Sequence, residues 1–190
     1  MDDLVIAALH KWPNVPAAYG WLALDARGDW YLRDEAVQAH APFPELKGSR
    51  IEHRRLIEFI GRNYLADGHG AWFFQNGPQR VYVELEAAPL VAGVERLSDD
   101  FVLTSHVGLA LGCPGACLLD ESGRLFVATS DGLAIVRSTD MLAAADALDA
   151  GAWPAPQAVV FGDLARRFGH QLQPTPPRSG PTTPVAPRPA

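Results

Sequence analysis

The pattern of apolar and polar positions along the chain predicts more strands than helices. Leu4, Ala8 and Trp12 recur at helical spacing, which predicts a short first helix that ends before Pro13. The stretch W-L-A-L-D-A-R-G-D-W-Y-L-R-D, residues 21–34, then predicts two strands around a turn at residues 25–28, because Asp and Gly favour turn conformations and aromatic and aliphatic residues flank them.

The clearest helical pattern is expected to begin near Arg50. Ser49 and Glu52 have the S-x-x-E spacing of a capping box, in which each side chain satisfies a backbone N–H at the helix start. Gly68 is a natural end for this helix. Its expected apolar face consists of Leu56, Ile57, Ile60 and Tyr64. Its expected charged face consists of Arg54, Glu58 and Arg62.

The stretch W-F-F-Q-N-G-P-Q-R-V-Y-V-E-L-E, residues 72–86, predicts a hairpin. Asn-Gly is typical of a two-residue turn, but Pro78 cannot donate the backbone N–H that such a turn requires. We therefore expect a four-residue loop at residues 76–79. Because Phe73 and Tyr82 point away from the predicted core, either the sheet is covered on both sides or they form an outer aromatic patch beside Arg80. Phe73, Arg80 and Tyr82 are thus the candidate binding residues.

The second half of the chain continues in the same way. We expect extended segments at residues 87–94 and 101–111, a hairpin at 117–127, a turn at 130–132 and a strand at 133–137. Ser138 or Thr139 can cap a helix that Gly151 ends. The strings L-D-A-R-G-D-W-Y-L and L-D-E-S-G-R-L-F-V are alike only around their turns, so we interpret them as two similar hairpins and not as a duplicated domain.

These elements predict an α+β fold, with antiparallel sheets built from hairpins and a few interleaved helices packed on them. We expect residues 1–172 to form a single globular domain, with a subdomain division near residue 95. Residues 173–190 are predicted to be a disordered Pro-rich tail, because they have almost nothing to bury. The tail contains three P-x-x-P motifs, which either dock in an aromatic groove of a partner or stay unfolded.

Composition narrows the classes of function. The chain has 190 residues and a formal net charge of -6, which argues against general nucleic-acid binding. The basic residues around the main helix could still form a local patch. The N-terminus lacks the basic start of a signal peptide, and no apolar stretch reaches the ~18 residues needed to span a bilayer. With two cysteines, the chain is expected to be a bacterial cytoplasmic protein without membrane association.

Candidate chemistry is confined to a few His, Asp and Cys positions. His106, Cys113 and Cys117 have the spacing H-x6-C-x3-C and could supply three zinc ligands. Alternatively, His106, His69 or His53 could activate one of the two thiols as a nucleophile. Two small buried structural cysteines explain the same pattern. Asp67 and His69, in D-G-H-G, could act as acid and base, but a turn explains the glycines equally well. We expect no cofactor and no metal.

A family resemblance lies mainly within residues 20–95. The strings F-I-G-R-N-Y and W-F-F-Q-N-G-P-Q-R-V-Y-V are its most specific parts, and they resemble a family of uncharacterised proteobacterial proteins. The resemblance implies a bacterial cytosolic domain of unknown function. From the residues themselves, we favour a non-catalytic binding or adaptor domain with a protein partner. The alternative is a small hydrolase or metal-assisted enzyme that uses His69, His106 and the two cysteines.

Overall fold

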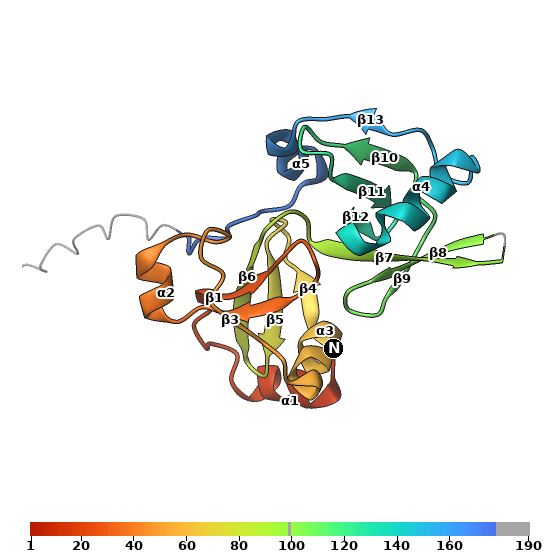
Figure 1. The fold of residues 1–190 in the computed structure, drawn as a ribbon. Helices are drawn as coiled ribbons and strands as arrows, with labels where there is room; N and C mark the ends of the chain where they lie inside the picture. Colours follow the sequence, from red (N-terminus) through yellow and green to blue (C-terminus); the bar gives the residue numbers. More distant parts are fainter. Residues whose placement is uncertain (99, 178–190) are drawn as a thin grey trace, which may run out of the picture.

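The computed structural model describes residues 1–98 and 100–177, which form two β-sheets with helices packed around them (Figure 1). The first half of the chain makes one sheet and the second half makes the other, so sequence order and spatial order largely agree. Within the described residues, no helix is long and apolar enough to cross a membrane. The fold is α+β with two mostly antiparallel sheets, as the pattern of hairpins predicts.

The first sheet has six strands in the order β3-β2-β1-β6-β5-β4. Its strands are β1 (Ala18–Leu24), β2 (Trp30–Leu32), β3 (Ser49–Arg50), β4 (Tyr64–Ala66), β5 (Trp72–Asn76) and β6 (Gln79–Leu85). The central pair, β1 and β6, is parallel, while the other neighbours are antiparallel. The parallel pair forms because the chain passes through α3 between the two hairpins, so that β6 then pairs with the edge of β1 that β2 leaves free.

The second sheet has seven strands in the order β13-β10-β11-β12-β7-β8-β9. Its strands are β7 (Leu90–Leu97), β8 (Asp100–Ser105), β9 (Ala110–Leu111), β10 (Ala116–Leu119), β11 (Leu125–Thr129), β12 (Gly132–Val136) and β13 (Gln157–Ala158). Two of its pairs are parallel, β12 with β7 and β10 with β13. The expectation of purely antiparallel sheets is therefore wrong for three strand pairs, which are β1–β6, β12–β7 and β10–β13. In each pair the two strands are distant in sequence.

Short helices cover the sheets. They are α1 (Asp3–Lys11), α2 (Glu35–His40), α3 (Arg54–Arg62), α4 (Met141–Asp149) and α5 (Phe161–Phe168), with one 3-10 turn, η1 (Ser138–Asp140). The expected first helix is confirmed, but its buried residue is Val5, whereas Leu4 is 86% exposed. The helix after η1 is also confirmed, although neither Ser138 nor Thr139 caps it with its side chain.

The main helix begins four residues later than its capping-box pattern predicts. Ser49 and Arg50 pair with β2 as strand β3, so neither residue is available to start a helix. His53 is the N-cap instead, and its Nδ1 accepts a hydrogen bond from the backbone N–H of Leu56 at 3.3 Å. The helix also ends early, because Tyr64 already belongs to strand β4. Strand pairing has overridden the local helix signals here.

The β5–β6 hairpin has the predicted register, but the expected four-residue loop at residues 76–79 is wrong, because Asn76 and Gln79 are themselves paired. Gln75 lies opposite Arg80, and the ladder continues for one further pair, Asn76 with Gln79. The turn itself therefore consists of Gly77, with a positive φ of 56°, and Pro78. Proline is tolerated because the strand partner that must donate is Gln79, not Pro78.

Both sheets contribute to one large apolar cluster. It contains Leu22, Val83 and Leu85 from the first sheet together with Leu118 and Phe126 from the second. A second cluster lies on the other face of the second sheet, under α4, and a small third cluster lies on the outer face of the first sheet. The chain passes between the sheets at residues 86–89, and the expected division near residue 95 stays a prediction.

The end of the described chain packs against the first sheet. The backbone N–H of Leu85 donates to the carbonyl of Leu172 at 2.8 Å, and Gln173 Nε2 donates to the carbonyl of Phe43 at 3.0 Å. Pro174 is buried. Gln173 and Pro174, the first residues of the predicted tail, therefore pack against the domain, whereas residues 178–190 of that tail lie outside the described residues.

Candidate binding site

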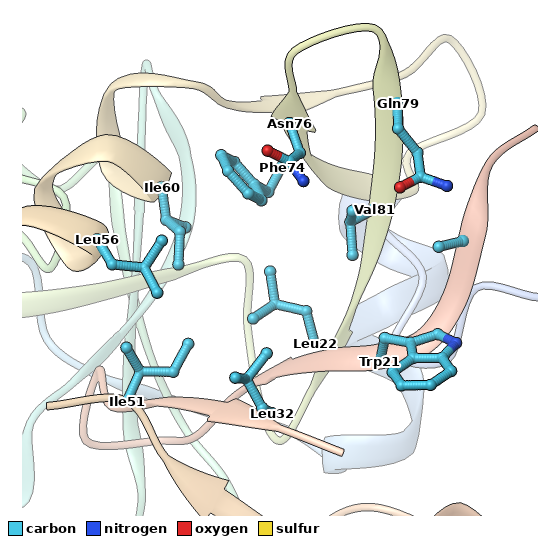
Figure 2. Close-up of a pocket in the computed structure, with 11 residues that line it drawn as sticks. Trp21, Leu22, Leu32, Ile51, Leu56, Ile60, Phe74, Asn76, Gln79 and Val81 are labelled. Atoms are coloured by element: carbon cyan, nitrogen blue, oxygen red, sulfur yellow. The ribbon is translucent and has the colours of Figure 1, made fainter. Parts of the chain in front are cut away.

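A largely apolar pocket lies on the first sheet beside α3 (Figure 2). Its volume is about 510 Å³, which is within the range of small-molecule sites. Leu56 and Ile60 of α3 form one side, and Trp21 of β1 forms the other. Leu22 and Val81 lie between them on the sheet. The remaining lining residues are Ala18, Leu32, Ile51, Phe74, Asn76 and Gln79.

An irregularity in β1 brings Trp21 to this pocket. Ala18 pairs with Val81 and Leu22 pairs with Val83, so three residues of β1 lie opposite Tyr82 alone. Gly20, at the centre of the irregularity, has a φ of 76° that favours glycine. Bulges of this kind redirect side chains. Ala18, Trp21 and Leu22 consequently line the same pocket, although strict alternation would separate Trp21 from Leu22.

The outer part of the pocket is open to solvent. Trp21 is 43% exposed and Leu32 is 50% exposed, although both are large apolar side chains. Leu22 and Ile60, at the base, are almost completely buried. The pocket thus combines a packed apolar base with exposed apolar walls, which is the arrangement expected of a surface that a ligand covers.

Among the described residues, no ionisable side chain lines the pocket. Its polar groups are the carboxamides of Asn76 and Gln79, at the end where β5 turns into β6. Gln79 Nε2 donates to the carbonyl of Pro16 at 3.0 Å, which fixes one end of its side chain. Carboxamides both donate and accept hydrogen bonds but do not transfer protons near neutral pH. The pocket can therefore orient an uncharged ligand, and it lacks a general acid, a general base and a nucleophile.

The predicted aromatic patch lies on the opposite face of the same sheet and is covered. Phe73 is 4% exposed and Tyr82 is 8% exposed. The guanidinium of Arg80 lies over the Phe73 ring at 4.7 Å from its centroid, and Tyr82 stacks on Tyr19 at 4.6 Å. The structure brings Phe73, Arg80 and Tyr82 together, and of the two alternatives it has the covered face, because Arg80 and the aromatic neighbours lie over Phe73.

Asp67 and His69 belong to a turn that borders this covered cluster. Asp67 Oδ1 accepts hydrogen bonds from the backbone N–H groups of His69 and Ala71, and its Oδ2 accepts one from the Tyr82 hydroxyl at 3.0 Å. Burial opposes ionisation of the Asp67 carboxyl, but these hydrogen bonds lower its pKa overall. Its oxygens are thus committed to the turn, and the imidazole of His69 is exposed.

His106 is a partly buried residue beside the aromatic side chains of the first sheet. Its ring lies 5.4 Å from the ring of Trp30 and 5.7 Å from that of Tyr64, and its Nδ1 accepts a hydrogen bond from the backbone N–H of Val91. Burial lowers the pKa of its imidazole to about 3. His106 is therefore neutral near pH 7 and packs against aromatic rings.

The two cysteines do not join His106 in a site. Cys113 is exposed, whereas Cys117 is fully buried in the cluster under α4, away from the aromatic neighbours of His106. Burial raises the pKa of the Cys117 thiol, so it is not an activated nucleophile. In the part of the chain that the structure describes, no three His, Cys, Asp or Glu side chains are close enough to hold a metal ion. The described structure therefore does not bring His106, Cys113 and Cys117 together as a set of zinc ligands.

Three of the basic residues around α3 form ion pairs. Arg50 pairs with Asp29 at 2.7 Å, and Arg54 pairs with Glu58 at 2.9 Å, as their spacing predicts. Arg62 pairs with Asp2, the N-cap residue of α1, and not with Glu58. Each of these three guanidinium groups therefore lies beside a carboxylate.

Sequence reasoning missed the pocket but contained a signal for it. Trp21 and Leu32 were assigned to a hairpin with no further role, although W-L-A-L places large apolar residues at successive positions. Such a run requires either a sheet covered on both sides or a break in alternation. Here β1 has the break, and its position follows from pairing with β6, which is about sixty residues away.

One family model matches most of the chain. A model described as "Protein of unknown function (DUF2946)" matches residues 1–175, which includes both sheets and the packed segment after α5. The chain belongs to this family. Membership in the DUF2946 family confirms the expected domain of unknown function and extends the resemblance from residues 20–95 to nearly the whole described chain. No curated protein matches this DUF2946 member.

Two solved structures are similar to this member of the DUF2946 family. A DUF1285 family protein from Silicibacter pomeroyi DSS-3 has 16% sequence identity and a TM-score of 0.50, over 77% of this chain and 84% of that one. A DUF1285 family protein from Shewanella baltica OS155 has 13% identity and a TM-score of 0.46, over 66% of this chain and 91% of that one. At this identity the first similarity concerns the fold alone.

Proposed function

We propose that this protein is a non-catalytic binding domain whose ligand is a largely apolar, uncharged small molecule held in the pocket between α3 and β1. The observation that carries the proposal is the pocket of about 510 Å³, whose walls include the exposed side chains of Trp21 and Leu32. Burying such apolar surface is favourable by roughly 25 cal/mol per Å².

The polar groups of the pocket support an uncharged ligand. A charged group would lose its hydration without meeting a side chain of opposite charge, because the lining residues include no acid and no base. Asn76 and Gln79 can hydrogen-bond a neutral polar atom at one end of the ligand, and the Trp21 ring offers a flat surface for the body. The same composition favours binding over catalysis, because proton transfer and covalent chemistry need groups that this pocket lacks.

The test is binding of Nile red, an uncharged apolar dye, to the full chain and to two variants. Leu32→Glu introduces a carboxylate at the pocket wall, where Leu32 is 50% exposed. The matched control is Leu97→Glu, since Leu97 is also a strand leucine, is 51% exposed and lies on β7, outside the pocket. We expect Leu32→Glu to weaken dye binding at least about tenfold, which corresponds to about 1.4 kcal/mol.

Leu97→Glu should bind the dye as the unmodified chain does. Equal affinity of all three proteins, or a loss of the same size in both variants, would show that the dye binds elsewhere and would contradict the proposal. Native mass spectrometry of the freshly purified chain provides an independent readout, since a small ligand retained in the pocket is expected to be absent from Leu32→Glu.

A further inference from the structure

A second cavity lies on the opposite face of the first sheet, at the Tyr19–Tyr82 pair. Its volume is about 280 Å³, and its walls include Tyr19, Tyr82, Asp67 and His69. The two tyrosine rings are nearly parallel, with 8° between their planes. Tyr82 is held in place by its hydrogen bond to Asp67. The pair is therefore a rigid aromatic surface and not two independent side chains.

The chain's own proline-rich segment forms another wall of this cavity. Pro174, Thr175 and Pro177 line it together with the tyrosines. Two hydrogen bonds of Gln171 anchor the segment beside the surface: its backbone N–H donates to the carbonyl of Gly70 and its Nε2 donates to the carbonyl of His69, both at 3.0 Å. Pro174 is buried, whereas Thr175 and Pro177 are exposed at the rim of the cavity.

The sequence of this segment suits an aromatic surface. Residues 173–177 read Q-P-T-P-P, in which each proline fixes its own φ and holds the preceding residue in an extended conformation. An extended proline-rich strand loses little conformational entropy on docking, and aromatic grooves recognise such strands for this reason. Arg178 follows Pro177 directly in the sequence, and the Asp67 carboxylate supplies a negative charge in the cavity wall.

We propose that the surface of Tyr19, Tyr82, Asp67 and His69 is a recognition site for a proline-rich segment of another protein, one that carries a basic residue after its last proline. Residues 174–177 occupy part of this site in cis and compete with that partner. The inference goes beyond the proposed function, because it concerns a different ligand on the other face of β1 and β6.

The size of the competition follows from the tether. A segment joined to its own site by a short linker has an effective concentration on the order of 1 mM. Against a peptide that binds with a Kd on the order of 100 µM, this concentration reduces the apparent affinity about tenfold. A partner peptide must therefore bind the site more tightly, or be present at a higher concentration, than it would if the cis segment were absent.

The experiment uses a fluorescein-labelled peptide with the sequence Q-P-T-P-P-R-S, identical to residues 173–179. Its anisotropy is measured with the full chain and with a full-length variant in which the seven prolines from Pro174 to Pro189 are replaced by serine. We expect the serine variant to bind the peptide about tenfold more tightly than the unmodified chain. Adding Tyr19→Ala to the serine variant should abolish binding, whereas adding Tyr31→Ala, a tyrosine outside this cavity, should not.

A second measurement does not depend on folding of the serine variant. In the unmodified chain labelled with 3-fluorotyrosine, peptide at millimolar concentration should shift the 19F resonances of Tyr19 and Tyr82 and leave those of Tyr31 and Tyr64 unchanged. Failure of the peptide to shift these resonances, or equal peptide affinity of the two chains, would overturn the proposal. Self-association of the unmodified chain that the serine substitutions remove would also overturn it, since the partner would then be a second copy.

Discussion

Four turns of this protein share one arrangement at the level of single residues. In each, an Asp or Ser side chain accepts a hydrogen bond from the backbone N–H four residues later, and a glycine with positive φ donates its N–H to the carbonyl of the same Asp or Ser. The four acceptors are Asp25, Asp67, Ser105 and Asp120. This arrangement explains why L-D-A-R-G-D and L-D-E-S-G-R look alike, and it assigns the D-G-H-G loop a structural role.

His170 is a buried histidine whose ring nitrogens lack hydrogen-bond partners among the described residues. It is 7% exposed. Burial lowers the pKa of its imidazole to about 4, and His106 is depressed by the same cause to about 3. Both side chains are neutral in the folded protein at pH 7, so the unfolded chain binds more protons below its ordinary histidine pKa of about 6.5.

Stability should therefore fall as the pH is lowered from 6.5 to 5. For each of these two histidines, the full free energy of unfolding is present above pH 6.5 and decreases as the pH falls toward the lowered pKa of the folded state. The expected loss between pH 6.5 and pH 5 is about 1–2 kcal/mol for each histidine. His170→Leu should remove its share of the pH dependence without lowering stability at pH 7.5, because no hydrogen bond is lost. Urea unfolding of both proteins at pH 7.5, 6.5 and 5 measures the difference; identical slopes would contradict this role of His170.

At the level of elements, the irregularity in β1 connects local backbone geometry to both proposed sites. Tyr19 and Trp21 flank Gly20 and lie on opposite faces, one against Tyr82 and the other in the apolar pocket. The strand β6 makes the same division, because Val81 lines the apolar pocket and Tyr82 the other cavity. The two surfaces are thus alternate sides of one parallel strand pair.

Gly20→Ala should disturb this element. An alanine at position 20 would have to keep the positive φ of Gly20, and its β-carbon would lie 2.5 Å from Gln38 Oε1. We therefore expect the free energy of unfolding to fall by about 1–2 kcal/mol. Trp21 should turn away from the pocket, and Nile red affinity should fall severalfold. Gly162→Ala is the control, since its φ is not positive and nothing lies within 4 Å of the added carbon. Unchanged dye affinity in a folded Gly20→Ala variant would show that the bulge does not position Trp21.

For the whole molecule, the shared apolar cluster predicts that the two sheets unfold together. Phe126 belongs to the second sheet but is fully buried in the cluster that also contains Leu22 and Val83 of the first. The C-terminal segment adds a further connection, because Leu172 accepts a hydrogen bond from Leu85 after the chain has completed the second sheet. These contacts favour one cooperative unit over two independent ones.

Phe126→Ala should lower the free energy of unfolding by about 3–5 kcal/mol, through lost burial and the cavity that remains. Amide hydrogen exchange should then accelerate by the same factor in β1 and β6 as in β10 and β11. Leu142→Ala, on α4 with 79% exposure, should change neither. Loss of protection confined to the second sheet would instead support the division near residue 95.

The sequence by itself determined the elements whose signals are local. Turn residues with short polar side chains and glycine specify the hairpins, and the position of Pro78 fixes the register of Gln75 opposite Arg80. The same local signals misplaced the start of α3, because pairing of Ser49 and Arg50 with β2 is a contact with residues almost twenty positions away. Local pattern is reliable where neighbouring residues supply the hydrogen bonds, and it fails where a distant strand supplies them.

Only the tertiary structure decided which apolar residues stay exposed and which polar residues are buried. Trp21 and Leu32 carry no mark in the sequence that separates them from core residues, since their exposure depends on where α3 stops covering the sheet. His106, a catalytic or metal-binding candidate in the sequence, instead packs against the rings of Trp30 and Tyr64. The burial of a side chain depends on its contacts with segments that are distant in sequence. The spacing of residues within one segment therefore does not predict it.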